Sequence, residues 1–412
     1  MKGKTNCFFI GKVWPEPGSS AAGSRMIQLI RLFLSAGWNV VFASAASKTR
    51  YSARLNEMGV DEVSVNLNCP EFDDFIRELN PSVVLFDRFM TEEQFGWRVA
   101  VQCPGAIRIL DTEDLHCLRE GRRIALKENR EYTNRDLMND VAMREMASIY
   151  RSDLSLIISR FEMNLLTSFF NVPPELLYHL PFMTDPLDES ETGKWPSFET
   201  RRDFVTIGNF LHTPNRDAVV YLKEEIWPRI RERLPGVNLH VYGAYPSEKI
   251  RRLQDSNEGF LIEGRAEDAK TVVGNARVLL APLRFGAGLK GKLLEAMQCG
   301  TPSVTSSIGA ESMHGDLPWP GEIEDDPEQF AKAAAALYQS ELKWQQAQKS
   351  GIEIVNKLYQ KNPAGNNLMK QIDGLMTDLK KHRLHNFTGA MLMHHSLAST
   401  KYMSKWIEEK NK

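Results

Sequence analysis

Short hydrophobic runs alternate with longer segments of helical periodicity along most of this chain. The first unit reads as a strand at 7–11, a loop rich in Pro, Gly and Ser at 12–23, a helix at 24–37 and a second strand at 38–44. Gly37 lies where a helix stop signal is expected. A strand, a helix and a second strand in succession predict a parallel sheet, because parallel strands need a crossover connection.

The same order of elements begins again near residue 203. A strand is predicted at 203–210, then a helix at 218–236 that is kinked or broken at Pro228, then a further strand at 238–244. The chain is therefore expected to be an α/β protein with two Rossmann-like domains that face a central cleft. In such sheets ligands bind at the carboxyl ends of the strands.

The segment between the two series is polar, contains several prolines and has weak periodicity, which is typical of a linker. The predicted boundaries are an N-terminal domain at 1–182, the linker at 183–202, a C-terminal domain at 203–360 and a helical extension at 361–412. A densely charged run at 119–145 is predicted to be a solvated helix face.

Composition narrows the class of protein without naming a function. The formal charge of -2 over 412 residues excludes a strong global attraction to nucleic acid or acidic lipid. The five cysteines are scattered and never form a C-x-x-C pair, which argues against a disulfide framework or a thiolate zinc site. No apolar run approaches the roughly 20 residues needed to span a bilayer, so a cytoplasmic location is expected.

The most informative stretch is RFGAGLKGKLLEAMQCGTPSV, residues 284–304. Three glycines bracket Lys290, with Lys292 next, between a predicted strand and a helix that ends near Gly300. Helix N-termini favour anions, glycine lets the backbone approach one closely, and lysine adds positive charge. The stretch therefore predicts an anion site. It is not a Walker A loop, and the alternative is a glycine turn with exposed lysines.

Glu295 lies one to two turns into this helix. A glutamate in the middle of a helix is usually only solvated. Here it is close enough to the predicted anion site to accept hydrogen bonds from ribose hydroxyls, as the acidic residue of dinucleotide-binding folds does.

The segments FGAGLKGKLLEAMQCGTPSVTSSIGAE, FVTIGNF, HVYGA and EGRAED resemble the donor domain of GT-B-fold glycosyltransferases of family 4, the group 1 type. The resemblance extends over roughly 203–345 and is mostly architectural over 1–182. It implies that the cleft binds a nucleotide-sugar such as a UDP- or GDP-sugar. It also implies transfer to an acceptor with retention of configuration and no metal, and a C-terminal extension that packs back on the N-terminal domain.

The resemblance also implies roles for individual residues. Gly288, Leu289 and Lys290 would hold the diphosphate, and Glu295 would take the ribose. The remaining donor-binding candidates flank the base, the diphosphate or the first strand of the C-terminal domain, and they are Gly23, Ser24, Gly208, Arg216, Arg265 and Ala266.

Two departures from the family pattern bear on the chemistry. The family commonly has two glutamates eight positions apart, but Ala287 stands eight positions before Glu295. The basic pair after the first strand of the donor domain is also altered, because GNFLHTPNR offers Asn209, His212 and Arg216. We therefore expect Lys290, with Arg216, to neutralise the leaving diphosphate.

His116 is the catalytic candidate from the N-terminal domain, alongside Lys290 and Glu295. It follows a predicted strand and the acidic residues Asp111, Glu113 and Asp114. The family often has a histidine that contacts the sugar from a comparable loop, and a nearby carboxylate could tune its pKa. The alternative is a surface histidine, and a metal site is less favoured because no second ligand cluster lies near.

Two other functions remain open at this stage. One is a nucleotide-sugar-binding protein that has lost catalysis, which Ala287 and the altered basic pair would explain. The other, less favoured, is a nucleotide-sugar isomerase related to the 2-epimerases. The sequence does not identify the acceptor, which could be a glycan, lipid carrier, protein, small molecule or RNA.

Overall fold

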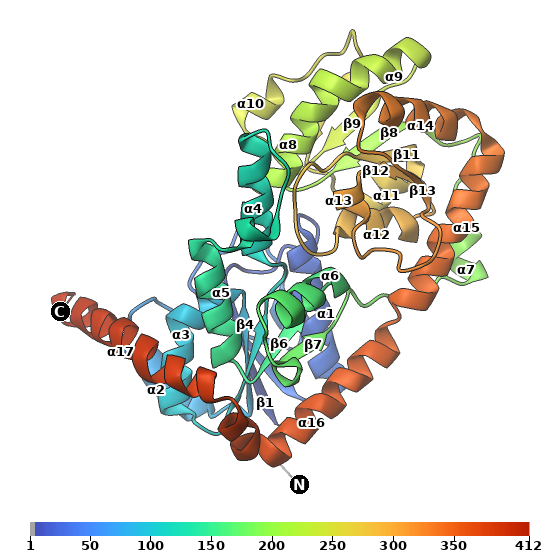
Figure 1. The fold of residues 1–412 in the computed structure, drawn as a ribbon. Helices are drawn as coiled ribbons and strands as arrows, with labels where there is room; N and C mark the ends of the chain where they lie inside the picture. The colour runs from blue at the N-terminus through green and yellow to red at the C-terminus, as the bar shows by residue number, and fades with distance from the viewer. Residues whose placement is uncertain (1–4, 412) are drawn as a thin grey trace.

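The computed structural model describes residues 5–411 and contains two α/β lobes, shown in Figure 1. The N-terminal lobe is built on a seven-stranded sheet of order β3-β2-β1-β4-β5-β6-β7. Its strands are β1 (Asn6–Gly11), β2 (Asn39–Ser44), β3 (Asp61–Ser64), β4 (Val83–Asp87), β5 (Ile107–Asp111), β6 (Leu154–Ile157) and β7 (Leu177–His179). Every pairing in this sheet is parallel.

The C-terminal lobe is built on a six-stranded sheet of order β10-β9-β8-β11-β12-β13, which is also parallel throughout. Its strands are β8 (Arg202–Ile207), β9 (Leu239–Tyr242), β10 (Phe260–Gly264), β11 (Ala276–Ala281), β12 (Ser303–Thr305) and β13 (Gly321–Ile323). The predicted α/β class with two Rossmann-like sheets is confirmed.

Helices cover both faces of each sheet, because the central strands are apolar on both sides. Residues 7–10 of β1 and 83–86 of β4 are completely buried, and two hydrophobic clusters cover the two faces of the N-terminal sheet. The helices of this lobe are α1 (Ala21–Ser35), η1 (Leu55–Met58), α2 (Glu71–Leu79), α3 (Phe89–Gln102), α4 (His116–Lys127), η2 (Asn134–Leu137), α5 (Asp140–Arg151), α6 (Arg160–Asn164), η3 (Leu165–Phe169) and η4 (Pro174–Leu176).

The remaining helices belong to the C-terminal lobe and the tail. They are α7 (Glu189–Thr192), α8 (Thr213–Tyr221), η5 (Leu222–Ile226), α9 (Trp227–Arg233), α10 (Glu248–Arg251), α11 (Ala269–Asn275), α12 (Gly291–Gln298), α13 (Ser307–Ala310), α14 (Pro327–Gln339), α15 (Glu341–Leu358), α16 (Lys361–His385) and α17 (Phe387–Lys410). Among residues 5–411, no helix combines the length and apolar character needed to cross a membrane.

Several local expectations differ from the structure. The helix expected at 218–236 is a run of three segments, α8, η5 and α9, that begins at Thr213 and ends at Arg233. Helix α1 begins at Ala21 rather than at residue 24, because the Ser20 hydroxyl accepts the Gly23 N–H and caps it.

The charged run at 119–145 is not one helix, because residues 128–139, which include η2, separate α4 from α5. It is also not a solvated face throughout, since Arg122 and Glu145 are buried.

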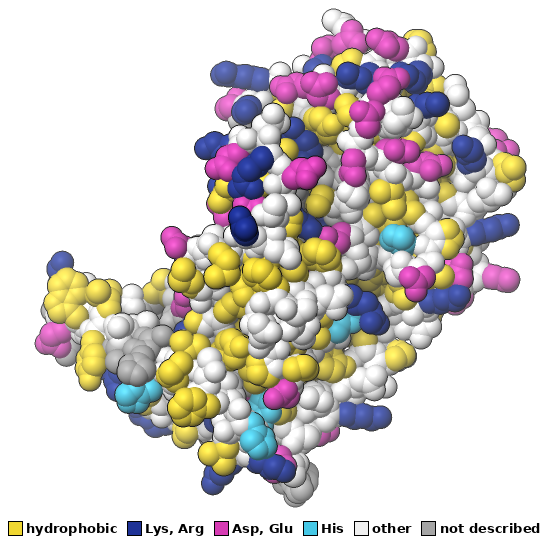
Figure 2. All heavy atoms as spheres, in the orientation of Figure 1, with side chains coloured by type: hydrophobic (Ala, Val, Ile, Leu, Met, Phe, Trp, Pro, Cys, Tyr) yellow, Lys and Arg dark blue, Asp and Glu magenta, His cyan; other side chains and the backbone are white. Residues whose placement is uncertain are grey.

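The tail returns to the N-terminal lobe. The chain passes between the lobes twice at one place, where Thr184 and Gln360 form a parallel bridge. Leu368 and Ile372 of α16 then join the same hydrophobic cluster as Leu29 of α1. In Figure 2, hydrophobic side chains gather over α5 and α17 of the N-terminal lobe, whereas charged side chains gather over α4 and the upper lobe.

In each sheet the strand order reverses direction beside the first strand, between β1 and β4 and between β8 and β11. Such switch points leave a crevice at the carboxyl ends of the strands, where ligands bind in open α/β sheets. The functional site is therefore sought where these two edges meet.

Candidate functional site

The N-termini of α1 and α12 lie against each other across the cleft. A Cβ added to Gly291, the first residue of α12, would lie only 2.6 Å from the Cβ of Ala21, the first residue of α1. Glycine therefore permits this approach. Both helix ends present positive dipole ends and backbone N–H groups, which is an arrangement that favours an anion between them.

The loop before α12 packs tightly against the N-terminal lobe. Gly288 has a φ of +63°, and a Cβ there would lie 2.9 Å from the Cβ of Asp114. Its N–H donates to Glu162 Oε1 at 2.9 Å, so a carboxylate already occupies one donor of the predicted anion loop. Leu289 is buried in the hydrophobic cluster of the C-terminal lobe.

Lys290 is buried among charged groups of both lobes. Its Nζ donates to the Gly288 carbonyl at 2.7 Å. Burial lowers the pKa of Lys290 to about 8, although the nearby carboxylates of Glu311 and Glu162 act in the opposite direction. Burial therefore favours the uncharged amine of Lys290, and the nearby carboxylates favour its charged form.

Lys292 lies in the first turn of α12 and was not among the predicted site residues. Its Nζ donates to Asn215 Oδ1 at 2.8 Å and lies 2.8 Å from the position that a Cβ on Gly208 would take. Burial lowers its pKa to about 8. Gly208 comes directly after β8, and Asn215 lies in α8. Their approach to Lys292 depends on tertiary packing, so the sequence alone could not show it.

Arg216 is exposed on α8, and its guanidinium donates to Thr213 Oγ1 at 3.4 Å. The structure does not bring it to the lysines, although sequence reasoning placed it beside Lys290. The cationic position next to Gly208 is filled by Lys292 instead.

Glu295 lies within α12, and Ala266 belongs to the loop after β10. Glu295 is half-buried, and its pKa is raised by burial and by Asp268, with Lys270 acting in the opposite direction. Ala266 is buried two residues after β10. Their assignment to the ribose and the base stays a prediction of the resemblance.

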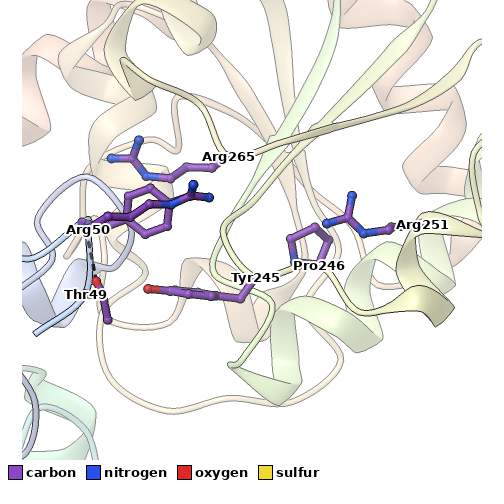
Figure 3. Close-up of a pocket in the computed structure, with 7 residues that line it drawn as sticks. Thr49, Arg50, Tyr245, Pro246, Arg251 and Arg265 are labelled. Atoms are coloured by element: carbon purple, nitrogen blue, oxygen red, sulfur yellow. Dashed lines mark hydrogen bonds between the residues drawn. The ribbon is translucent and has the colours of Figure 1, made fainter. Parts of the chain in front are cut away.

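Arg265 crosses the cleft to the N-terminal lobe. Its guanidinium lies 4.3 Å from the centre of the Tyr51 ring, and its Nε donates to Ser19 Oγ at 3.3 Å. A pocket of about 400 Å³ opens beside it. Figure 3 shows Arg50 and Arg265 on one side of this pocket and Arg251 on the other, with Tyr245 and Pro246 between them.

A second pocket of about 260 Å³ lies deeper between the lobes, and both lobes line it. Its walls include Gly23 and Met26 of α1, Asp87 at the end of β4, Arg88 directly after it, and Asn209 after β8. The hydroxyl of Tyr245 donates to the Glu16 carboxylate at 2.9 Å at its edge. This pocket joins the switch points of the two sheets.

Gly23 and Ser24 do not open the first helix as expected. Because Ser20 caps α1, the Gly23 N–H is bonded to the Ser20 hydroxyl and the Ser24 hydroxyl donates to the Pro17 carbonyl at 3.0 Å. Gly23 lies within 2.6 Å, measured from an added Cβ, of the Glu16 backbone. The requirement for glycine here is therefore explained by packing of the loop.

His116 is the first residue of α4. Its Nε2 lies 3.4 Å from Asp114 Oδ1, and its ring packs edge-to-face on Phe89. Burial lowers the pKa of His116 to about 3, and Asp114 only partly offsets this while Arg119 and Arg88 add to it. The imidazole is therefore neutral near pH 7 and suited to hydrogen bonding rather than to proton uptake.

The strand ends of the N-terminal lobe contribute charged residues that sequence reasoning missed. Asp87 is buried and accepts from the Lys12 N–H at 3.0 Å, and burial raises its pKa. Arg88 has a φ of +69° and immediately precedes α3. Asp87 ends the buried strand β4 at the switch point and Arg88 follows it, which is the signal that could have found them.

Within the described side chains, no group of three His, Cys, Asp or Glu residues is arranged to hold a metal ion. Asp111 and Asp114 near His116 are instead paired with Arg25 and Arg119. Both Nε and Nη2 of Arg25 donate to the Asp111 carboxylate, and both side chains are buried.

A buried ion pair holds the lobes together at one side of the cleft. Arg122 of α4 donates to both carboxylate oxygens of Glu311, at 2.9 and 2.6 Å, and to the Gly286 carbonyl at 2.8 Å. The Phe161 N–H donates to Ser312 Oγ beside it. The arrangement described here is thus a closed one.

Comparison with known proteins agrees with this architecture. Residues 201–340 match the family model described as "Glycosyl transferases group 1". No curated protein matches the sequence significantly.

Several solved structures share the fold at low sequence identity. The sucrose-phosphate synthase of Thermosynechococcus elongatus superposes with a TM-score of 0.65 at 14% identity, over 91% of this chain and 100% of that chain. HepE of Anabaena, in complex with UDP and glucose, gives 0.65 at 11%, over 90% and 100%. A TarM mutant of S. aureus, in complex with Fondaparinux, alpha-GlcNAc-glycerol and UDP, gives 0.56 at 10%, over 73% of this chain, which spans 58% of TarM.

The two parallel sheets and these superpositions establish the GT-B fold, and the family match covers the C-terminal lobe. The chain therefore has the GT-B fold, and its residues 201–340 match the model of the group 1 glycosyl transferases.

Proposed function

We propose that the protein transfers a sugar from a nucleotide-sugar to an acceptor hydroxyl, with retention of configuration. The observation that carries the proposal is the meeting of the α1 and α12 N-termini, with the loop 286–290 and its lysine at their junction. A nucleoside diphosphate is the anion that a group 1 transferase domain would hold at that place. HepE and TarM were solved with UDP, which supports a uridine nucleotide as the first donor to test.

In the proposed reaction the bond between C1 of the sugar and the β-phosphate oxygen breaks, and its electron pair goes to that oxygen. The acceptor oxygen forms the new bond to C1 on the same face, and its proton passes to the departing phosphate. The loop 288–290 and the two helix ends stabilise the charge that develops on the phosphate. We propose that this positive environment takes the place of a resident metal.

Other residues bind and orient the substrates in this proposal. Glu295 accepts from the ribose, Arg265 and Ala266 flank the base, and neutral His116 donates or accepts one hydrogen bond at the sugar. Glu162 occupies the Gly288 N–H in the closed arrangement, so donor entry requires the lobes to open and this carboxylate to withdraw.

A second candidate is a nucleotide-sugar-binding protein without transferase activity, which Ala287 favours because the first family glutamate is absent. An isomerase related to the 2-epimerases is less favoured, because no motif supports it. The acceptor class stays unassigned among glycans, lipid carriers, proteins, small molecules and RNA.

The first test is thermal denaturation of the purified protein with UDP-, GDP- and ADP-sugars, followed by assay of nucleoside diphosphate release with and without EDTA. Stabilisation by one donor and its metal-independent turnover are expected. Stabilisation without turnover, in the presence of mixed acceptors, would favour the binding protein. No stabilisation by any donor would refute the proposed function.

A further inference from the structure

The C-terminal tail exposes a group of large apolar side chains, most of them on α17. Among the described residues, every exposed Phe, Tyr or Trp side chain lies in this tail. Soluble proteins seldom leave large apolar side chains together in solvent, and such a surface usually marks a binding site. The group, called here the tail patch, comprises Leu384, Phe387, Met391, Tyr402, Met403 and Trp406.

On α17 the tail patch is the outer face of a helix whose inner face is held by polar contacts. Ser404 is buried, and its hydroxyl accepts from Arg98 at 2.9 Å, while Glu408 pairs with the same guanidinium. Tyr402 and Trp406 are each two residues from Ser404, and two residues turn an α-helix by about 200°. Both rings therefore point away from the lobe against which α17 packs.

The place of α17 in the molecule leaves this outer face accessible. In Figure 1 the helix runs along the N-terminal lobe on the side away from the C-terminal lobe, and its last turns extend past the lobe. Figure 2 shows hydrophobic side chains at this end of the helix, on the face that the view presents. The tail patch is thus separate from the cleft and its two pockets.

The tail also has a charge balance opposite to that of the whole chain. Residues 376–410 contain six Lys and Arg residues against three Asp and Glu residues, whereas the chain has a formal charge of -2. Among the residues that the structure describes, Lys380, Lys381 and Lys401 form no ion pair with a carboxylate. The Nζ of Lys410 lies 5.2 Å from the centre of the Trp406 ring. Lysines therefore flank the apolar side chains.

This combination favours a lipid surface over a second copy of the chain as the occupant. Two copies joined through the tail patch would bring the same lysines together, and like charges repel. A bilayer with anionic head groups offers the opposite charge, and long lysine side chains reach its phosphates while their stems stay on apolar surface. The interface of a bilayer is also where Trp and Tyr rings are enriched.

We infer that the outer face of α17 binds the surface of a lipid bilayer that carries anionic head groups. The rings of Tyr402 and Trp406 enter the boundary between head groups and acyl chains together with the rest of the tail patch, and the flanking lysines contact the lipid phosphates. The helix lies along the surface. This inference goes beyond the proposed function and does not depend on it.

The test is sedimentation of the purified protein with lipid vesicles, in the absence of any nucleotide. Vesicles of phosphatidylcholine alone are compared with vesicles in which about a third of the lipid is phosphatidylglycerol. The wild type should bind the anionic vesicles at least about tenfold more tightly. Raising the salt to about 0.5 M should remove most of this difference, because salt screens exposed charges.

Two sets of variants separate the apolar contribution from the charge. Tyr402→Ser combined with Trp406→Ser should weaken binding to anionic vesicles about 10- to 100-fold, because two large apolar side chains no longer enter the bilayer. Lys381→Gln and Lys401→Gln should each weaken it about fivefold. Leu342→Ser is the matched control and should change nothing, since Leu342 is 68% exposed but belongs to α15.

Melting temperatures show whether each variant folds. Tyr402 and Trp406 are exposed, so their replacement should leave the melting temperature unchanged. If the double serine variant proves unstable, Met391→Gln combined with Met403→Gln alters the same patch and carries the same test.

Several outcomes would overturn the inference. They are binding of the wild type to neither kind of vesicle, equal binding to both, and unchanged binding of the double serine variant. A wild-type dimer that the double serine variant does not form, measured by light scattering without vesicles, would also overturn it, because the tail patch would then join two copies. Since no nucleotide is present, none of these results bears on the donor site.

Discussion

The two sides of the cleft handle charge in opposite ways. The N-terminal side is rich in buried carboxylates, and most of them are already engaged: Asp111 with Arg25, Glu145 with the N–H groups of His116 and Cys117. The C-terminal side presents glycines, backbone N–H groups and lysines, and Lys292 there donates to the neutral amide oxygen of Asn215.

This difference in charge indicates different roles for the two sides of the cleft. Engaged carboxylates hold the strand-end loops of the N-terminal lobe in a fixed shape. A lysine and free backbone N–H groups at a helix N-terminus favour an anion. The two sides meet where Arg122 pairs with Glu311 and where Glu162 accepts from the Gly288 N–H. Charged groups of each lobe therefore find partners on the other lobe.

The largest expected effect comes from removing the ion pair between Arg122 and Glu311. Arg122→Gln should weaken the closed arrangement by about 3 kcal/mol, because Glu311 and the Gly286 carbonyl lose a buried partner. The measurements are the radius of gyration in solution and the melting temperature. Arg123→Gln is the matched control: its pair with Glu120 is partly exposed and should contribute at most about 1 kcal/mol. Equal behaviour of the two variants would show that the lobes are held by other contacts.

A second prediction concerns the acidic side and its pH dependence. Burial, with Asp111 and Asp87 nearby, raises the pKa of Glu113 to about 8. Because the folded protein holds this proton more tightly than the unfolded chain, whose glutamates titrate near about 4.3, the stabilisation is complete below that value. It is lost as the pH rises through about 8. The melting temperature should therefore fall between about pH 5 and pH 8.

Replacing Glu113 by Gln should flatten that decline, whereas Glu57→Gln on the exposed surface should leave it unchanged. Melting curves at several pH values measure both. An unchanged slope in the Glu113 variant would show that this carboxyl is ionised in the folded protein.

The smallest effect is expected from the glycine loop on the C-terminal side. Gly288→Ala should destabilise the protein by about 1–2 kcal/mol from its left-handed backbone, with a further contribution from contact with Asp114. Gly286→Ala is the control, since a Cβ there meets only ordinary contacts at 3.8 Å. Denaturant unfolding measures both, and a neutral Gly288→Ala would mean that the loop relaxes easily.

Much of the fold follows from local pattern. The buried strands and the helix stripes are set by hydrophobic spacing, so both sheets could be predicted from the sequence. The start of α1 was missed because the Ser20 cap lies inside a loop of small residues that reads as irregular. The solvated face predicted at 119–145 was wrong because Arg122 and Glu145 look like surface residues until their partners, distant in sequence, are known.

The site was less predictable because its geometry is long-range. Glycine and lysine before α12 indicated an anion site, but nothing in the order of residues shows that Lys290 donates to the Gly288 carbonyl and Lys292 to Asn215 of α8. Nor does it show that Glu162, from the other lobe, accepts from the Gly288 N–H. Local spacing identifies the loop, and tertiary packing decides which of its side chains is available.

The return of α16 to the N-terminal lobe has a consequence for synthesis of the chain. Leu368, Ile372 and Leu375 complete the same core as Leu29 and Phe33 of α1, although more than three hundred residues separate them. The C-terminal sheet, by contrast, is contiguous between β8 and β13. During synthesis the half that leaves the ribosome second can therefore finish its core first, while the N-terminal half waits for the last helices.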